Sequence, residues 1–400
     1  MKNQLSNNKE ITILFGGDFY CKNIPKIDKK VIEIFNQADY SMVNLEAPIL
    51  NNKSQFNKRL KSGPSIYQKE EIIEILKQLK IQHVGGANNH IMDFGIKGIQ
   101  STTSALDKNN IFYAGFGINP EKIRSPLVLK NTKIQILCLG EEEFGASKKN
   151  SPGHYSVYGE EVLDQIKHLK SSDKFIIIFA HGGGEEIPLP SSYIRDRFQQ
   201  FIDNGADLVL GHHPHVPQGY ERYKDKLIFY SLGNFIHSSY NESIGILLKV
   251  VIFNSKVKSF EIIPIKTRRH MIDIGNYSEL DDYINLSNKI LQNNLLRESV
   301  LQEQAEYMFT SYYRYYLKNI FSFKRSLKSL LKRCAGIGKM FGELESNFLL
   351  LLLLRNKSHR EFIETALKIR TKEIKDLRSN VSEDYFRELI NYINKFIGKS

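Results

Sequence analysis

The stretch that decides the fold is Ala206-Asp207-Leu208-Val209-Leu210-Gly211-His212-His213-Pro214-His215. Its first five residues form a mostly apolar run, which predicts a buried strand. Three histidines follow at the carboxyl end of that strand. Open α/β sheets bind ligands at the carboxyl ends of their strands, and imidazole is a favoured ligand of divalent transition metals. The stretch therefore predicts a metal site on an α/β sheet, with a hydrogen-bonded histidine corner as the alternative.

Short apolar runs alternate with amphipathic helices before this stretch. One such helix, residues 70–79, has isoleucines and leucines at a spacing of three to four. A hairpin is predicted around Asn131-Thr132. The alternation predicts a layered α/β domain. Three later apolar runs have no helix between them, which indicates a second sheet and a sandwich core. These runs are 227–231, 244–253 and 259–266.

The sequence pattern changes after about residue 275, where glycine and strand signals become rare and long helical segments follow. The predicted helices span 280–316, 322–332, 342–355, 358–379 and 383–396. We therefore expect two parts, an α/β domain over residues 1–270 and a basic helical extension over residues 271–400.

The net charge of +12 is concentrated in the last part of the chain, since residues 251–400 carry 26 Lys/Arg against 17 Asp/Glu. The segment 306–333 holds eight Tyr or Phe, seven Lys or Arg and one acidic residue, Glu306. A basic aromatic helix of this kind can lie on an acidic membrane surface or contact nucleic acid, whereas aromatic residues at helical spacing more often pack as a buried seam. We expect an anionic partner or a solubilising surface here, and no nucleic-acid partner.

The cysteine pattern and the amino terminus bear on the compartment. Cys21, Cys138 and Cys334 lie far apart and form neither a zinc-ribbon spacing nor a disulfide framework, which indicates a reducing environment. The first ten residues are polar, unlike a signal peptide, and the sequence contains no apolar run of about 18 residues. We expect a cytoplasmic protein that could associate peripherally with a membrane through its extension.

Five predicted strands end in side chains that can ligate metals. These side chains are Asp18, Glu46, Asn89 with His90, His181, and His213 with His215. A mixture of carboxylate and imidazole groups suits Mn, Fe or Zn. A single polar strand end is also explained by the capping of the helix that follows. Five in sequence order favour a metal centre.

The order of these groups resembles the calcineurin-like metallophosphoesterase superfamily, and within it the CapA family of poly-γ-glutamate capsule biosynthesis proteins. The matching motifs are Gly17-Asp18, Asn44-Leu45-Glu46-Ala47-Pro48, Ala87-Asn88-Asn89-His90-Ile91-Met92-Asp93-Phe94-Gly95, His181-Gly182-Gly183-Gly184-Glu185, Gly211-His212-His213-Pro214-His215-Val216-Pro217-Gln218 and Tyr230-Ser231-Leu232-Gly233-Asn234-Phe235. The likeness covers roughly residues 10–265. It implies a metallophosphoesterase-like layered αββα sandwich, to which the all-helical carboxyl-terminal extension is added.

The resemblance also implies a role for each ligand of one or two divalent ions. Glu46 stands at the bridging position. Asp18 and His215 would bind one metal. The other metal would be bound by Asn89, His181 and His213.

Further residues are implied in catalysis and substrate binding. His90 would contact the substrate or protonate the leaving group, with Asp93 orienting its ring. Asp93 could equally cap the helix that begins near Gly95. His212 and Glu185 are candidates for substrate binding. Lys61 is another candidate for binding an anionic substrate, although a lysine in such a loop more often lies in solvent.

Three positions depart from the superfamily pattern. Tyr20 stands where the first motif has a histidine, the longer Glu46 replaces an aspartate, and Gly182 replaces a common tryptophan. Two hypotheses therefore stand. The first is a metal-dependent phosphoesterase-like hydrolase in capsule or cell-surface polymer biosynthesis. The second is a non-hydrolytic accessory protein that binds an anionic polymer or a membrane-bound synthase.

Overall fold

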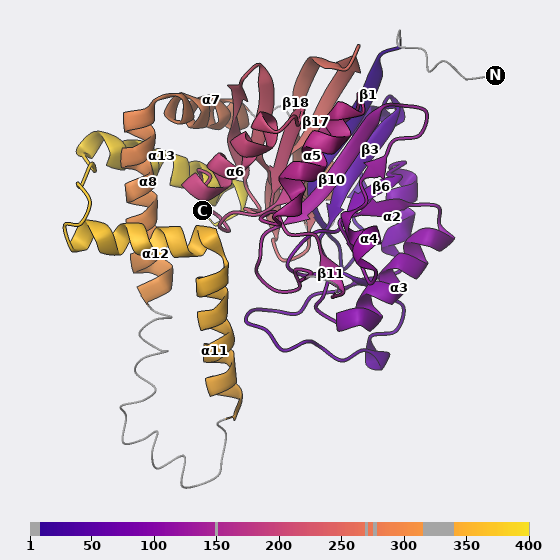
Figure 1. Cartoon of the computed structure of the whole chain (residues 1–400), viewed down its shortest axis with the longest axis horizontal. Coiled ribbons are helices and arrows are strands. Elements are labelled where there is room, and N and C mark those ends of the chain that lie inside the picture. Colours follow the sequence, from indigo (N-terminus) through magenta and orange to yellow (C-terminus); the bar gives the residue numbers. More distant parts are fainter. Residues whose placement is uncertain (1–8, 149–150, 269–270, 275–277, 315–339, 400) are drawn as a thin grey trace.

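The apolar run before the histidines forms strand β13 (Leu208–His212), which lies inside the smaller of two large sheets. The structure is a computed structural model that describes residues 9–148, 151–268, 271–274, 278–314 and 340–399. Figure 1 shows the sheets on one side and the carboxyl-terminal helices on the other.

The larger sheet is mixed, with a parallel half that begins at the strand carrying Asp18. Its path is β2 (Lys26–Ile27), β19 (Met271–Ile274), β18 (Lys256–Arg268), β17 (Glu242–Phe253), β1 (Ile11–Tyr20), β3 (Tyr40–Leu45), β6 (His83–Gly85) and β7 (Phe112–Ala114). A further strand, β16 (Asn234–His237), runs parallel to the last residues of β1. β1, β3, β6 and β7 are mutually parallel, so their carboxyl ends meet at one edge.

The smaller sheet also has a parallel centre. Its order is β14 (Pro217–Tyr223), β15 (Lys226–Leu232), β13, β12 (Phe175–His181), β10 (Ile134–Gly140) and β9 (Leu127–Val128). β10, β12, β13 and β15 are parallel, whereas β9 pairs antiparallel with β10. The hairpin predicted around Asn131-Thr132 is confirmed.

The two sheets pack face to face, and helices cover both outer faces. Alternate residues of β1 point to opposite sides: Phe15 lies in the core between the sheets, where its ring is 6.2 Å from that of Phe179, and Leu14 lies in the core beneath the first helices. The outer helices are α1 (Lys29–Asn36), α2 (Ile72–Gln78) and α3 (Gly95–Lys108) on the larger sheet, and α5 (Glu161–Ser171) and α6 (Ser192–Asp203) on the smaller. The layered αββα sandwich is thus confirmed.

Short elements connect these layers. They are the helices α4 (Pro120–Arg124) and η1 (Lys53–Gln55) and two two-stranded sheets, one of β4 (Ile49–Leu50) with β5 (Gln68–Lys69) and one of β8 (Phe116–Gly117) with β11 (Gly153–His154).

The carboxyl-terminal part is helical, as expected. Its elements are α7 (Ser278–Gln292), α8 (Asn294–Met308), the π-helical turn η2 (Phe309–Tyr313), α11 (Met340–Arg355), α12 (Lys357–Arg370) and α13 (Asn380–Phe396). The prediction of one helix over 280–316 is wrong, because Asn293 ends α7 and caps α8 by accepting a hydrogen bond from the Leu296 N–H. The helix predicted over 322–332 lies outside the described residues.

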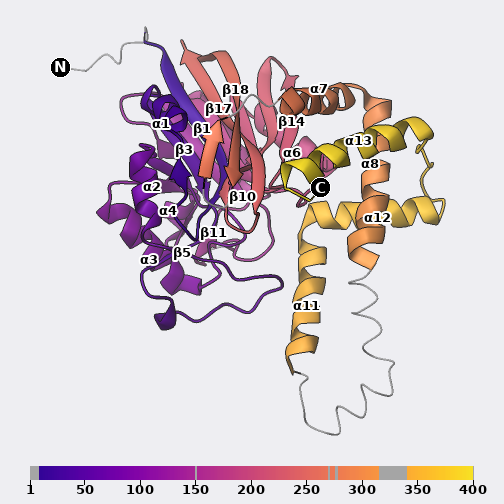
Figure 2. The ribbon, with the colours of Figure 1, turned by 180° about the vertical axis from the view of Figure 1, so that it is seen from behind.

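The extension packs on the edge strand β14, and Figures 1 and 2 show its helices gathered beside the sandwich. The Gly219 N–H of β14 donates to Ser287 Oγ of α7, and the Tyr220 N–H donates to Asn288 Oδ1. A Cβ at Gly219 would lie 2.6 Å from those two side-chain oxygens, so the close approach requires glycine here. None of the helices in the described ranges is both long and apolar enough to cross a membrane.

Candidate metal centre

The carboxyl ends of parallel strands from both sheets meet at one edge of the sandwich. Asp18, near the end of β1, lies opposite Asn44 of β3. His181 at the end of β12 lies opposite His212 at the end of β13. The six predicted ligands gather at this edge, and none is more than 7% exposed. The topology thus collects side chains that are far apart in the sequence.

Asp18 is fully buried among imidazole rings. Its Oδ1 lies 2.8 Å from Asn44 Nδ2, 3.1 Å from His212 Nδ1 and 3.3 Å from His181 Nδ1. Burial raises the pKa of Asp18, but hydrogen bonds from His181 and His212 outweigh it and hold the pKa well below its usual range. Asp18 is therefore a carboxylate that neighbouring histidines keep charged.

The His213-Pro214-His215 turn has an unusual backbone. His213 and His215 have φ values of 106° and 60°, in the left-handed region that residues other than glycine rarely adopt. The His213 N–H donates to Asp18 Oδ2 at 2.9 Å, which helps to hold the turn. Strained backbone of this kind often accompanies functional sites. The turn brings both imidazoles beside Glu46.

Glu46 follows β3 and is fully buried. His237 Nε2 lies 3.0 Å from its Oε2, and His215 Nε2 lies 3.5 Å from its Oε1. Within the described ranges, neither oxygen of Glu46 forms a hydrogen bond of good geometry. Burial raises the pKa of Glu46, but nearby His215 and His237 lower it to about 2. A buried carboxylate without hydrogen bonds is costly, and a bound cation would stabilise it.

Glu46 belongs to two groups of side chains that could hold a metal ion. The first group is Glu46, His215 and His237, and the second is Glu46, His181 and His213. In each group, the ligand atoms lie within 4.8 Å of one another. Asn89 adjoins the second group, because its Oδ1 lies 3.2 Å from His181 Nε2. The buried donors therefore fit two neighbouring divalent ions that share Glu46.

The pKa values of His213 and His215 are also consistent with a metal centre. Burial lowers the pKa of His215, but Glu46 and Asp18 outweigh burial and raise it to about 10. Burial also lowers the pKa of His213, and Glu143 raises it to about 9. Imidazole must lose its proton to ligate a metal, so a bound cation would replace these protons as the counter-charge.

His212 lies deeper than its predicted role in substrate binding would suggest. It forms a third group with Asp18 and His181, and its ring centroid lies 4.4 Å from that of Phe179. It is 1% exposed and does not line the neighbouring pocket. His212 is therefore placed to hold Asp18 and His181.

His90 is held by a buried charged pair. Its Nδ1 lies 2.8 Å from Asp93 Oδ2 and 3.0 Å from Lys61 Nζ, and Lys61 Nζ lies 2.5 Å from Asp93 Oδ1. Asp93 also accepts a hydrogen bond from the Ile66 N–H, and α3 begins at Gly95 without a side-chain cap. Asp93 therefore contacts the ring of His90, and its side chain does not cap α3. The Lys61 side chain is only 3% exposed, unlike a solvated loop lysine.

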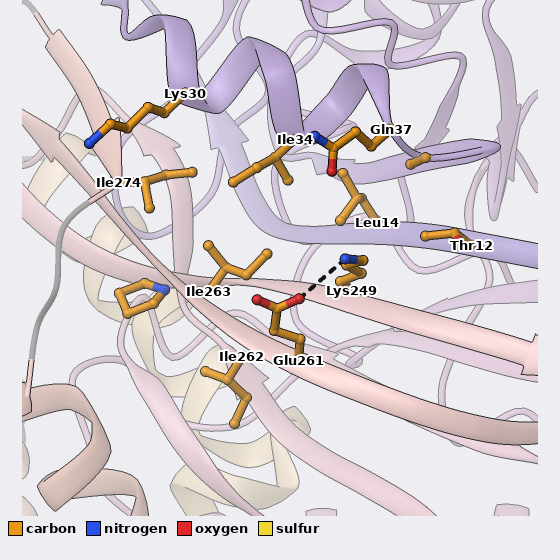
Figure 3. A pocket seen from close by; sticks show the side chains of 12 residues that line it. Thr12, Leu14, Lys30, Ile34, Gln37, Lys249, Glu261, Ile262, Ile263 and Ile274 are labelled. Atoms are coloured by element: carbon orange, nitrogen blue, oxygen red, sulfur yellow. Dashed lines mark hydrogen bonds and ion pairs between the residues drawn. The ribbon is translucent and has the colours of Figure 1, made fainter.

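A pocket of about 620 Å³ opens beside the centre, between the sandwich and the extension. Asn89, His90 and Lys61 line its inner side, and Glu185, which is exposed, also lines it. Another hollow, of about 470 Å³, lies between α1 and strands β1, β17 and β18 (Figure 3). Its lining includes a Lys249–Glu261 ion pair but none of the predicted site residues, so it is not the candidate site.

Sequence reasoning missed several residues of the centre. His237 completes a ligand group, and Asn44 links Asp18 to His181. Glu143 follows β10 and accepts a hydrogen bond from Asn89 Nδ2 at 2.8 Å. A local signal exists for Glu143, because Glu141-Glu142-Glu143 follows the apolar run 134–139 after a single glycine, Gly140, and that run predicts a strand.

The comparisons with known proteins show the family to which the chain belongs. Residues 7–239 match the family model of the bacterial capsule synthesis protein PGA_cap. The match covers more than half of the chain, so the chain belongs to this family of bacterial capsule synthesis proteins. The resemblance to the CapA family is thereby confirmed.

Two relatives and one solved structure illustrate the similarity. The capsule biosynthesis protein CapA of Bacillus anthracis is 29% identical over 236 residues, which cover 57% of this chain and 56% of the relative. The PGA biosynthesis protein CapA of Bacillus subtilis (strain 168) is 30% identical over 220 residues, covering 54% and 57%. The chain thus spans a little over half the length of these relatives. The crystal structure of TT1561 of Thermus thermophilus matches with a TM-score of 0.34 and 13% identity, over 64% of this chain and 99% of that chain.

Proposed function

We propose that the protein is a metal-dependent hydrolase of phosphate esters that works in the synthesis of a capsule or cell-surface polymer of the poly-γ-glutamate type. The family and the names of the Bacillus relatives support the biosynthetic setting. The observation that carries the hydrolase proposal is the position of Glu46. It is a buried carboxylate that accepts no hydrogen bond of good geometry from the described residues, and two groups of potential metal ligands share it.

The chemistry follows from the side chains around the centre. Two divalent ions held by the groups that share Glu46 would supply an activated water and stabilise charge on an anionic substrate. The mixed carboxylate and imidazole donors suit Mn, Fe or Zn. Asp93 occupies the Nδ1 side of His90, so Nε2 is the nitrogen that would give a proton to the leaving oxygen when the ring carries both protons. Lys61 supplies positive charge at the same wall of the pocket.

Metal content and hydrolysis together test this proposal. The full chain, purified without chelator or affinity-tag metal, should hold one or two equivalents of Mn, Fe or Zn by mass spectrometry. It should hydrolyse p-nitrophenyl phosphate or bis(p-nitrophenyl) phosphate. His181→Ala should abolish both properties, whereas His168→Ala, on the exposed side of α5, should leave both unchanged. A protein that binds no metal after incubation with Mn²⁺ would refute the proposal.

A second candidate is a non-hydrolytic accessory protein that binds an anionic polymer or a membrane-bound synthase. Tyr20 favours it, because this residue takes the place of a superfamily histidine and its buried hydroxyl has no hydrogen-bond partner among the described residues. The basic extension would then contact the polymer, the synthase or the membrane surface. A metal-free protein that still binds poly-γ-glutamate would support this function over the first.

A further inference from the structure

The helical extension is bonded directly to the candidate metal centre. Asn356, fully buried between α11 and α12, donates from Nδ2 to Glu143 Oε1 at 2.8 Å. The other oxygen of Glu143 accepts from Asn89 Nδ2, also at 2.8 Å. Two hydrogen bonds thus connect the extension to a predicted metal ligand.

A second buried glutamate forms a parallel link. The N–H and Oγ of Ser358 donate to Glu141 Oε1 at 3.3 and 3.2 Å. Glu141 Oε2 accepts from the Gly183 N–H at 2.7 Å, two residues after His181. The amino-terminal end of α12 therefore rests on two carboxylates, an arrangement that the helix dipole favours. These contacts hold the extension against the candidate metal centre, where it forms one side of the neighbouring pocket.

The extension lines the pocket with both polar and apolar side chains. Lys61 and His90 lie at the polar side, next to the centre. The extension contributes Met308 at the end of α8 and Leu349 and Leu352 of α11, which are three residues apart and so share a helix face. Phe144 adds a further apolar side chain from the sandwich. The pocket is much larger than a phosphate group and within the usual range for organic ligands.

We propose that this pocket binds the organic part of the substrate, and that the substrate is an amphipathic phosphate ester. Its anionic group lies at the centre near Lys61 and His90, and its alkyl or aryl group lies along Met308, Leu349 and Leu352. The inference rests on the proposed function and adds to it a substrate class and a specificity role for the extension.

Two matched, non-hydrolysable probes test the inference by isothermal titration calorimetry on the full, Mn²⁺-loaded chain. The probes are methylphosphonate and n-hexylphosphonate, which share a head group and differ in apolar length. The hexyl compound should bind at least about tenfold more tightly, because methylene groups leave water. Leu352→Gln should remove most of this preference and leave the affinity for methylphosphonate unchanged. Leu354→Gln is the matched control, since Leu354 is on the same helix, 57% exposed and outside the pocket.

The possible outcomes distinguish a failure of this inference from a failure of the proposed function. Equal affinity for the two phosphonates in a metal-loaded protein would overturn the inference and leave the hydrolase proposal intact. A hexyl preference that persists in both leucine variants would place the apolar contact elsewhere and would also overturn it. If the chain holds no metal and binds neither probe, the proposed function fails and the inference fails with it. Thermal melting followed by circular dichroism checks that both variants are folded.

Discussion

Tyr20 and His237 are register partners on the parallel strands β1 and β16, and their ring centroids lie 5.2 Å apart in an edge-to-face arrangement. The superfamily histidine that Tyr20 replaces would come from β1. Here an imidazole comes from the adjacent strand, and its Nε2 lies 3.0 Å from Glu46 Oε2. The centre thus has a histidine beside Glu46, although the first sequence motif has Tyr20 where the superfamily has a histidine.

The first prediction concerns His237, the histidine that β16 supplies in place of one on β1. His237→Ala should lower the metal content by about one equivalent, because it removes one of the three side chains of the Glu46–His215–His237 group. The double variant Tyr20→His/His237→Ala should recover at least part of the loss, since it returns an imidazole to β1. Mass spectrometry of the purified proteins measures both effects. An unchanged metal content in His237→Ala would show that His237 is not a ligand.

The second prediction concerns metal removal. Mn²⁺ should stabilise the wild-type chain by about 2.7 kcal/mol at a free concentration one hundred times its dissociation constant. Glu46→Gln should lose most of this gain, because two of the three ligand groups share Glu46. Thermal melts with EDTA and with added Mn²⁺ provide the comparison. Equal shifts in the two proteins would mean that the cation binds elsewhere.

The third prediction concerns the link between Asn356 and Glu143. Asn356→Ala removes a hydrogen bond to a buried carboxylate and also the amino-terminal cap of α12, where Asn356 Oδ1 accepts from the His359 N–H. The free energy of unfolding should fall by about 2–4 kcal/mol. Asn293→Ala, which removes only the exposed cap of α8, should cost about 1 kcal/mol. Urea denaturation measures both, and similar losses would argue against the buried link.

The fourth prediction concerns proton transfer. His90→Gln should lower kcat by about 10²–10⁴-fold while leaving the metal content unchanged, because His90 lies outside all three ligand groups. Steady-state hydrolysis of an aryl phosphate and metal analysis of the same preparation test both parts. A variant that keeps full activity would remove His90 from the mechanism, and one that loses its metal would place it among the ligands.

The sandwich and the meeting of the six candidate ligands at one edge could be predicted from the sequence, because each motif is local. An apolar run followed by a carboxylate or imidazole marks the carboxyl end of a strand, and parallel strands bring such ends to one edge. The buried position of Lys61 was harder to predict, because it depends on Asp93, which lies 32 positions further along.

Other parts of the site depend on contacts that no local pattern encodes. His237 becomes a candidate ligand only because β16 pairs with β1, although the two strands lie more than 200 positions apart. Asn356 reaches Glu143 only after α12 has packed on the sandwich. The break between α7 and α8 was missed because a single asparagine cap interrupts an otherwise continuous helical pattern.

The contact between α7 and β14 also affects whether one molecule can associate with another copy of itself. β14 is an outer strand of its sheet, and an uncovered outer strand offers its backbone as a template for pairing with another chain. Ser287 and Asn288 occupy two of the N–H groups that such a template would use. A chain shortened to remove the extension, α7 included, would expose this template and should form strand-paired aggregates. Thus α7 protects the edge of the sandwich against self-assembly, whereas α8, α11 and α12 contribute to the pocket.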